Sequence, residues 1–266
     1  MLEIFQYSFM IRALIVGSII ACIAPLIGIF LVSKRYSLMA DALSHVCLAG
    51  VAIGMLLQIY PVYTALIVSV ISAICIEKLS HSKRITGEST LALFLSGGLA
   101  VATVIISFAR GFTVDLFSYL FGSITTVSEG DVLITIILAA VIILVIGVLY
   151  KELFYVAFDE ESARVSGLPA SQINYIFMIL AAITIALSIR IVGVLLISAL
   201  MVIPVLAGSL IAKSFKQTLI ASILFSLFVV ITGLFLSYYF NLAAGGAIVL
   251  LSLAGFSILH LMSGKD

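Results

Sequence analysis

The chain has 266 residues, of which 64% are hydrophobic and only 9% are charged. An ordinary soluble domain carries charge on roughly a quarter of its residues. The 13 basic and 12 acidic side chains are too few to cover a water-soluble fold of this length. This composition excludes a soluble enzyme, a nucleic-acid-binding protein and a disordered chain. We therefore expect an all-α polytopic membrane protein that has lipid as its solvent and no nucleic acid as a partner.

Nine apolar stretches approach the length that a transmembrane helix needs, which is about 20 residues. They lie at 10–32, 37–57, 61–79, 90–109, 132–150, 171–189, 192–212, 218–239 and 243–262. A shorter stretch, Val114–Ile124, lies between the fourth and the fifth and predicts a re-entrant or surface helix. We expect one transmembrane domain over residues 1–266 with about nine spans, and eight is the alternative count.

The distribution of lysine and arginine predicts how the chain is oriented in the membrane, because cytoplasmic loops are enriched in these residues. With nine spans and an outside N-terminus, three basic residues fall outside: Arg12, Arg110 and Arg190. The other ten fall inside: Lys34, Arg35, Lys78, Lys83, Arg84, Lys151, Arg164, Lys213, Lys216 and Lys265. Nine spans therefore predict an outside N-terminus and a cytoplasmic C-terminus.

The second span contains an acid and a histidine in the middle of an apolar sequence. Asp41 and His45 are four residues apart, so on a helix they share one face. An acid inside the membrane is costly and is expected to face protein or water. The pair predicts either a structural contact between helices or a metal or proton site, since carboxylate and imidazole are common ligands of zinc, manganese and iron. Two copies of the chain meeting on this helix would supply four ligands, and Gly50 and Gly54 have the spacing that permits close helix contact.

The longest charged connection, residues 151–170, predicts a short amphipathic helix on the cytoplasmic side. Acidic residues at Asp159–Glu161 favour a helix N-terminus, and Gly167 followed by Pro169 favours its end. Such a segment is either a surface connector or a docking element for a soluble partner. The chain contains no GxxxxGK[ST] motif, so an ATP-driven mechanism would need a separate ATPase.

The chain resembles the membrane permease subunits of bacterial ABC importers for zinc, manganese and iron. Four segments carry the resemblance: Ser37–Gly50, Tyr119–Ile124, Phe158–Ala163 with Gly167, and Val192–Pro204. The sequences Tyr-Leu-Phe-Gly-Ser-Ile and Phe-Asp-Glu-Glu are most similar to those of zinc-uptake permeases. The resemblance departs at Asn241, where related proteins often carry an acid and prolines, so it leaves the role of that outer loop open.

The resemblance implies a homodimer in the bacterial inner (plasma) membrane, bound to two cytoplasmic ATPase subunits and supplied by an extracellular metal-binding protein. It implies that Asp41 and His45 contact the transported ion. It also implies that a cytoplasmic coupling segment within residues 151–170 contacts the ATPase, through Phe158, Asp159, Glu160, Ala163 and Gly167. The expected cargo is a divalent metal ion, zinc first and manganese next, with no permanently bound cofactor and no enzymatic activity in this chain.

Two other classes of protein compete with this interpretation. An ion-coupled secondary metal transporter usually has more buried acids than the single Asp41. An intramembrane enzyme could use Asp41 and His45 as an acid/base pair, but the chain has no HExxH motif and no Ser/His/Asp set at a plausible spacing. Zinc and manganese suit the ligand pair about equally.

Overall fold

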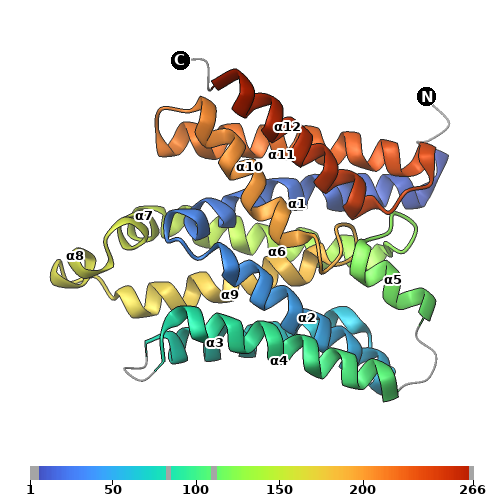
Figure 1. Cartoon of the computed structure of the whole chain (residues 1–266), viewed down its shortest axis with the longest axis horizontal. Coiled ribbons are helices and arrows are strands. Elements are labelled where there is room, and N and C mark those ends of the chain that lie inside the picture. Colours follow the sequence, from blue (N-terminus) through green and yellow to red (C-terminus); the bar gives the residue numbers. More distant parts are fainter. Residues whose placement is uncertain (1–5, 82–84, 109–112, 264–266) are drawn as a thin grey trace. The chain divides into compact units, whose positions relative to one another are not determined.

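The computed structural model describes residues 6–81, 85–108 and 113–263, and Figure 1 shows its order of helices. These described residues contain helices and no strand, which confirms the all-α prediction. Two compact units make up the chain: residues 1–29, 115–140 and 188–266 form one, and residues 30–114 and 141–187 form the other.

The unit of residues 30–114 and 141–187 is organised around α2, which packs against α3 and α4. Its helices are α2 (Ser37–Leu57), α3 (Pro61–Ser80), α4 (Gly87–Phe108), α7 (Tyr150–Phe158), α8 (Glu160–Val165) and most of α9 (Ala170–Ser188), together with the C-terminal parts of α1 (Ser8–Ser33) and α6 (Glu129–Val148). The backbone of Gln58 ends α2 in the left-handed region, with φ 57°. Proline at the first position of α3 has its φ already set for a helix and no N–H to leave unpaired. The turn between α2 and α3 is therefore short and well defined.

The unit of residues 1–29, 115–140 and 188–266 contains three helices that pack against one another, α10 (Ile197–Ile211), α11 (Phe215–Phe240) and α12 (Ala244–Ser263). It also holds most of α1, the start of α6 and most of α5 (Thr113–Phe121). The Ser214 side chain caps α11 by accepting a hydrogen bond from the N–H of Gln217. Glycines at the contacts, such as Gly233 against Ile248, let the helices of this unit approach closely.

Eight of the described helices are long and apolar enough to cross a membrane, and each corresponds to a predicted span. For α2 the predicted and observed boundaries are identical. The count of nine is not confirmed, because the predicted span 192–212 forms a helix of only 15 residues, α10. The short helix expected at Val114–Ile124 corresponds to α5.

The chain before α10 is not helical because its backbone pairs with the end of α5 and with the turn that follows it. The N–H of Val194 donates to the carbonyl of Tyr119 at 2.9 Å, and the N–H of Ser123 donates to the carbonyl of Arg190 at 3.0 Å. Gly122 and Gly193 have φ of 75° and 83°, and a Cβ on either would lie within 2.4 Å of a backbone oxygen. These hydrogen bonds satisfy polar backbone groups within an otherwise apolar segment, which lipid could not do.

Candidate metal centre and coupling segment

Asp41 and His45 stand one turn apart on α2, and both side chains are partly exposed while Ala42, Leu43 and Ser44 between them are buried. The Nδ1 atom of His45 is itself buried and has no hydrogen-bond partner among the described residues. A buried nitrogen without a partner is costly, and a bound ligand would remove that cost. The two side chains are therefore placed to offer ligands from one helix face.

Three glycines set the position of α2 between its neighbours. A Cβ at Gly98 of α4 would lie 2.7 Å from the backbone nitrogen of Val46 and 2.8 Å from the carbonyl carbon of His45. On the side of α3, Gly50 meets the backbone of Ala65 and Gly54 meets Pro61 at similarly short distances. The close helix contact expected from the Gly50–Gly54 spacing is thus made with α3 of the same chain.

Two other side chains of types that can bind metal, Cys47 and His260, make contacts of their own. The thiol of Cys47 is buried towards α3 and donates to the carbonyl of Ala65 at 3.8 Å. His260 is exposed and stacks on Phe256. No group of three or more His, Cys, Asp or Glu side chains that could hold a metal is found among the described residues. Asp41 and His45 alone are too few for a closed tetrahedral site.

The segment 151–170 forms two short helices, α7 and α8, with the helix start and stop that the sequence predicts. Asp159 caps α8 by accepting hydrogen bonds from the hydroxyl of Ser162 and from its N–H, and these bonds lower the pKa of Asp159. Gly167, with φ 85°, ends the helix in a Schellman motif, in which Leu168 N–H donates to Ala163 O and Gly167 N–H to Arg164 O. The predicted coupling residues thus belong to one capped helix and its immediate flanks.

The predicted coupling residues differ in exposure. Phe158 is 61% exposed, whereas Ala163 is fully buried. Val165, which the sequence interpretation did not single out, is 89% exposed and extends the apolar surface of this segment. Ala163 and Gly167 therefore shape the helix, and Phe158 and Val165 present apolar side chains at its surface.

Glu160 and His81 belong to a polar cluster that the sequence did not predict. The Nε2 atom of His81, which directly follows α3, lies 3.3 Å from Glu77 and 3.8 Å from Glu160. Asn174 also contacts Glu160. Glu160 and Asn174 are distant in the sequence from Glu77 and His81, and only the packing of α3, α8 and α9 brings them together.

Arg190, one of the three basic residues that the sequence places outside, is largely buried in a second polar cluster. Its side chain is 13% exposed, lies 3.6 Å from the carboxylate of Asp131 and stacks over the ring of Tyr119. It also donates to the carbonyl of Thr126 at 3.3 Å. Asp131 is only 4% exposed, and the sequence analysis did not single it out.

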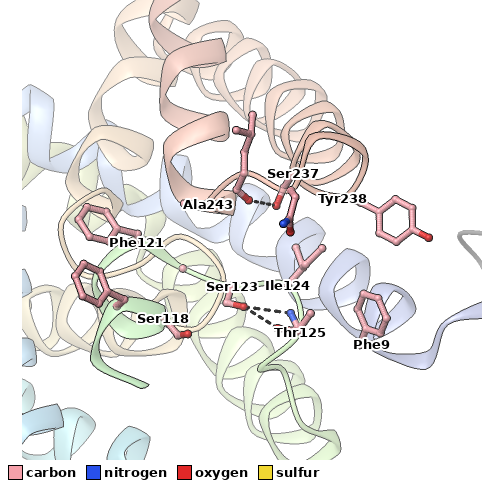
Figure 2. A pocket seen from close by; sticks show the side chains of 13 residues that line it. Phe9, Ser118, Phe121, Ser123, Ile124, Thr125, Ser237, Tyr238 and Ala243 are labelled. Atoms are coloured by element: carbon pink, nitrogen blue, oxygen red, sulfur yellow. Dashed lines mark hydrogen bonds between the residues drawn. The ribbon is translucent and has the colours of Figure 1, made fainter. Parts of the chain in front are cut away.

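A cavity of about 490 Å³ lies beside this cluster in the same unit, between α5, the turn after it and the end of α11 (Figure 2). Its lining mixes aromatic rings with hydroxyl groups and includes Asn241, at which the resemblance departs from the expected pattern. Asn241 is the left-handed C-cap of α11. The residue therefore has a clear structural role at this position.

Fold and composition together define a polytopic all-helical membrane protein. A family model described as "ABC 3 transport family" matches residues 6–263. The chain belongs to this family, and its resemblance to ABC importer permeases is thereby confirmed.

Three relatives align over nearly their whole length. The chain is 38% identical to a probable metal transport system membrane protein of Treponema pallidum, covering 93% of this chain and 92% of the relative. It is 31% identical to the manganese transport system membrane protein MntC of Listeria monocytogenes, covering 98% and 93%. It is 29% identical to the high-affinity zinc uptake system membrane protein ZnuB of Haemophilus influenzae, covering 93% and 95%.

The fold is also similar to a solved structure described as PsaBC from Streptococcus pneumoniae in complex with Fab. The TM-score is 0.86 at 32% sequence identity, over 96% of this chain and 92% of that chain. Sequence and fold thus agree on the family.

Proposed function

We propose that this chain is the membrane-spanning permease subunit of an ATP-driven importer of divalent metal ions. The observation that carries the proposal is the buried Nδ1 of His45, which has no hydrogen-bond partner in the described part of the chain. It lies one turn from Asp41 in a chain of the ABC 3 transport family. The metal transport named for three relatives supports the same cargo class.

In this proposal residues 1–266 act as one permease domain, and two copies meet so that each contributes Asp41 and His45 to the ion's path. Four ligands from two chains would suit a tetrahedral ion. Each chain alone supplies an incomplete set, which favours transient binding, because an ion held too tightly could not leave.

Zinc is our first choice of cargo and manganese the second. The segments Tyr119–Ile124 and Phe158–Glu161 resemble those of zinc permeases, while relatives named for manganese and for zinc have similar identity to this chain. Imidazole and carboxylate ligands accommodate both ions. Competition between the two ions during uptake would distinguish them.

The test is metal uptake into proteoliposomes that contain the permease, its ATPase partner and its extracellular metal-binding protein. Asp41→Ala and His45→Ala should each abolish uptake and leave assembly with the ATPase intact. Cys47→Ala is the matched control, because it removes a potential ligand from the same helix on the side of α3. Normal uptake by both Asp41→Ala and His45→Ala would overturn the site, and uptake without any ATPase would overturn the energy source.

The proposal gives residues 151–170 the role of the cytoplasmic coupling segment, with one ATPase subunit bound to each copy of the chain. The exposed Phe158 and Val165 supply apolar contact area for such a partner. Asp159 and Gly167 support this surface by starting and ending α8.

We further propose nine membrane crossings, with the N-terminus outside and the C-terminus in the cytoplasm. Tyr7 contacts Tyr238 and Gly17 lies beside Val230, so α1 and α11 run in opposite directions. Contacts of Gly233 with Ile248 and of Gly255 with Phe225 show that α12 also runs opposite to α11. Since α1 and α12 then run in the same direction, the N-terminal end of α1 and the C-terminal end of α12 point to opposite sides. This supports an odd number of crossings. The ninth crossing is α10 with the non-helical chain before it.

Cysteine labelling in intact cells tests this topology. In a background without the three native cysteines, Gln6→Cys should react with an impermeant maleimide, whereas Ser263→Cys should react only after lysis. Labelling of both positions, or of neither, before lysis would refute the odd number of crossings.

A further inference from the structure

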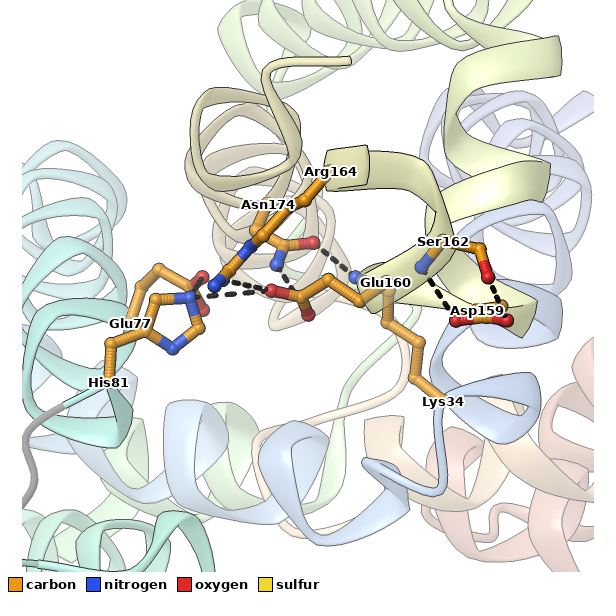
Figure 3. Close-up of polar contacts among 8 residues, drawn as sticks. All are labelled: Lys34, Glu77, His81, Asp159, Glu160, Ser162, Arg164 and Asn174. Carbon is orange, nitrogen blue, oxygen red and sulfur yellow. Dashed lines mark hydrogen bonds and ion pairs between the residues drawn. The ribbon is translucent and has the colours of Figure 1, made fainter. Parts of the chain in front are cut away.

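Glu160, the first residue of α8, connects the proposed coupling segment to two other helices (Figure 3). Its Oε1 atom lies 2.5 Å from the guanidinium of Arg164 and 3.8 Å from His81 at the end of α3. Its Oε2 atom accepts a hydrogen bond of 3.1 Å from the amide of Asn174 on α9. Both oxygens of one carboxylate are therefore used to attach α8 to α3 and α9.

Asn174 extends this connection into the interior. Only 4% of the residue is exposed, and its Oδ1 atom accepts a hydrogen bond from Nζ of Lys34. The same ammonium group lies 5.6 Å from the centre of the Phe177 ring. Asn174 thus bridges a carboxylate on α8 and an ammonium group beyond the end of α1.

Lys34 belongs to a tight connection between α1 and α2. Arg35 has φ 60°, its N–H donates to the carbonyl of Val32, and the N–H of Tyr36 donates to the carbonyl of Leu31. Only three residues separate α1 from the start of α2 at Ser37. Because this turn is short and hydrogen-bonded, it ties the backbone of Lys34 closely to the first turn of α2, which leads directly to Asp41.

The burial of Lys34 is unfavourable for the fold taken by itself. Desolvation lowers the pKa of Lys34, and the nearby carboxylates of Glu160 and Glu77 only partly oppose it. Burying a charge costs free energy unless it is paired, and the direct hydrogen-bond partner of Lys34 is the neutral amide of Asn174. Stability alone therefore does not explain the contacts that join Glu160, Asn174 and Lys34.

We propose that Glu160, Asn174 and Lys34 are positioning residues that transmit movement of the coupling helix α8 to the start of α2 and so to Asp41 and His45. The inference rests on the proposed function, because it assigns the path by which an ATPase bound at α8 would change the metal site. All of the contacts lie within one compact unit of the chain.

The decisive variant is Asn174→Ala, which interrupts the path at a residue too buried to touch an ATPase. In the reconstituted importer, the amount of metal imported per ATP hydrolysed should fall about tenfold while ATP hydrolysis continues. Gln172→Ala is the matched control, since it removes an exposed amide from the same turn of α9. A wild-type ratio of metal to ATP in Asn174→Ala would overturn the proposal.

Two further variants separate transmission from stability. Glu160→Ala should lower the ratio to the same extent, and the double variant with Asn174→Ala should be no worse than either one, because both act in one path. Additive losses would contradict a shared path. Lys34→Met with Asn174→Leu replaces the polar contact with an apolar one and should fold stably yet remain uncoupled. Restored coupling in this variant would show that the contact serves only packing.

The wild-type complex distinguishes the two proposals. Failure of the wild type to import zinc or manganese would refute the proposed function. Metal import by the wild type, combined with unchanged coupling in the variants, would refute only the transmission path.

Discussion

Substitution of Gly98 by alanine tests how strongly the positions of Asp41 and His45 depend on the packing of α4 against α2. The added Cβ would lie 2.7 Å from the backbone nitrogen of Val46 and 2.8 Å from the carbonyl carbon of His45. An ordinary contact of at least 3.4 Å requires the two backbones to separate by about 0.7 Å. Both partners are backbone atoms, so no flexible side chain can absorb the change.

The expected result is a loss of transport that exceeds the loss of stability. Overpacking of this kind costs roughly 1–3 kcal/mol, and a misplacement of about 1 Å at a reacting or binding group costs up to about 100-fold in rate. We therefore expect metal uptake to fall by at least about tenfold in Gly98→Ala. The assay is initial uptake in proteoliposomes at equal amounts of assembled complex.

The neighbouring glycine supplies the control for this experiment. A Cβ at Gly97 would meet nothing within 4 Å, so Gly97→Ala makes the same chemical change on the same helix without contact. Equal uptake by Gly97→Ala and Gly98→Ala would refute the reasoning that the backbone of α4 positions His45.

Three other changes test the coupling helix and the buried ion pair. Because capping hydrogen bonds lower the pKa of Asp159 below 3.8, its contribution to α8 is present above that pH and is lost as the pH falls through the lower, folded-state value. As the pH falls through that value, hydrogen exchange of the α8 amides should accelerate in the wild type. It should not accelerate in Asp159→Asn, whose side chain caps the helix but does not titrate. Arg190→Leu should lower the free energy of unfolding by about 3–5 kcal/mol, because it leaves the buried carboxylate of Asp131 without its cation; an unchanged midpoint of thermal unfolding would contradict this. Phe158→Ala should weaken ATPase binding at least tenfold, whereas Phe108→Ala, another exposed aromatic, should leave it unchanged in a pull-down titration.

The buried cluster around Arg190 shows why some features of this chain could not be predicted. The side chain contacts Asp131 and Tyr119, which are 59 and 71 residues away in the sequence. Nothing local to Arg190 indicates those partners. The same holds for the contact of His81 with Glu160 and for Asn174, whose neutral amide gave no sign of a link between two charges.

Features that depend on local sequence were predicted well. Hydrophobic length determined the eight long helices, since a lipid core tolerates few charges within about 20 residues. The start and end of α8 followed from Asp159 and Gly167, because capping and a positive φ are properties of single residues and their immediate neighbours. The spacing of Asp41 and His45 placed both on one face of α2 for the same reason.

Only the tertiary structure decided where α10 begins, because the cause lies outside its own sequence. The apolar run 192–212 is long enough for a span, yet its first residues pair with the backbone at the end of α5 and only Ile197–Ile211 is helical. It also decided that Gly50 and Gly54 face α3 of the same chain and that Gly98 meets His45. Composition and periodicity reflect whether each segment faces lipid, protein or water. These contacts depend instead on which distant backbone segments pack against it in the fold.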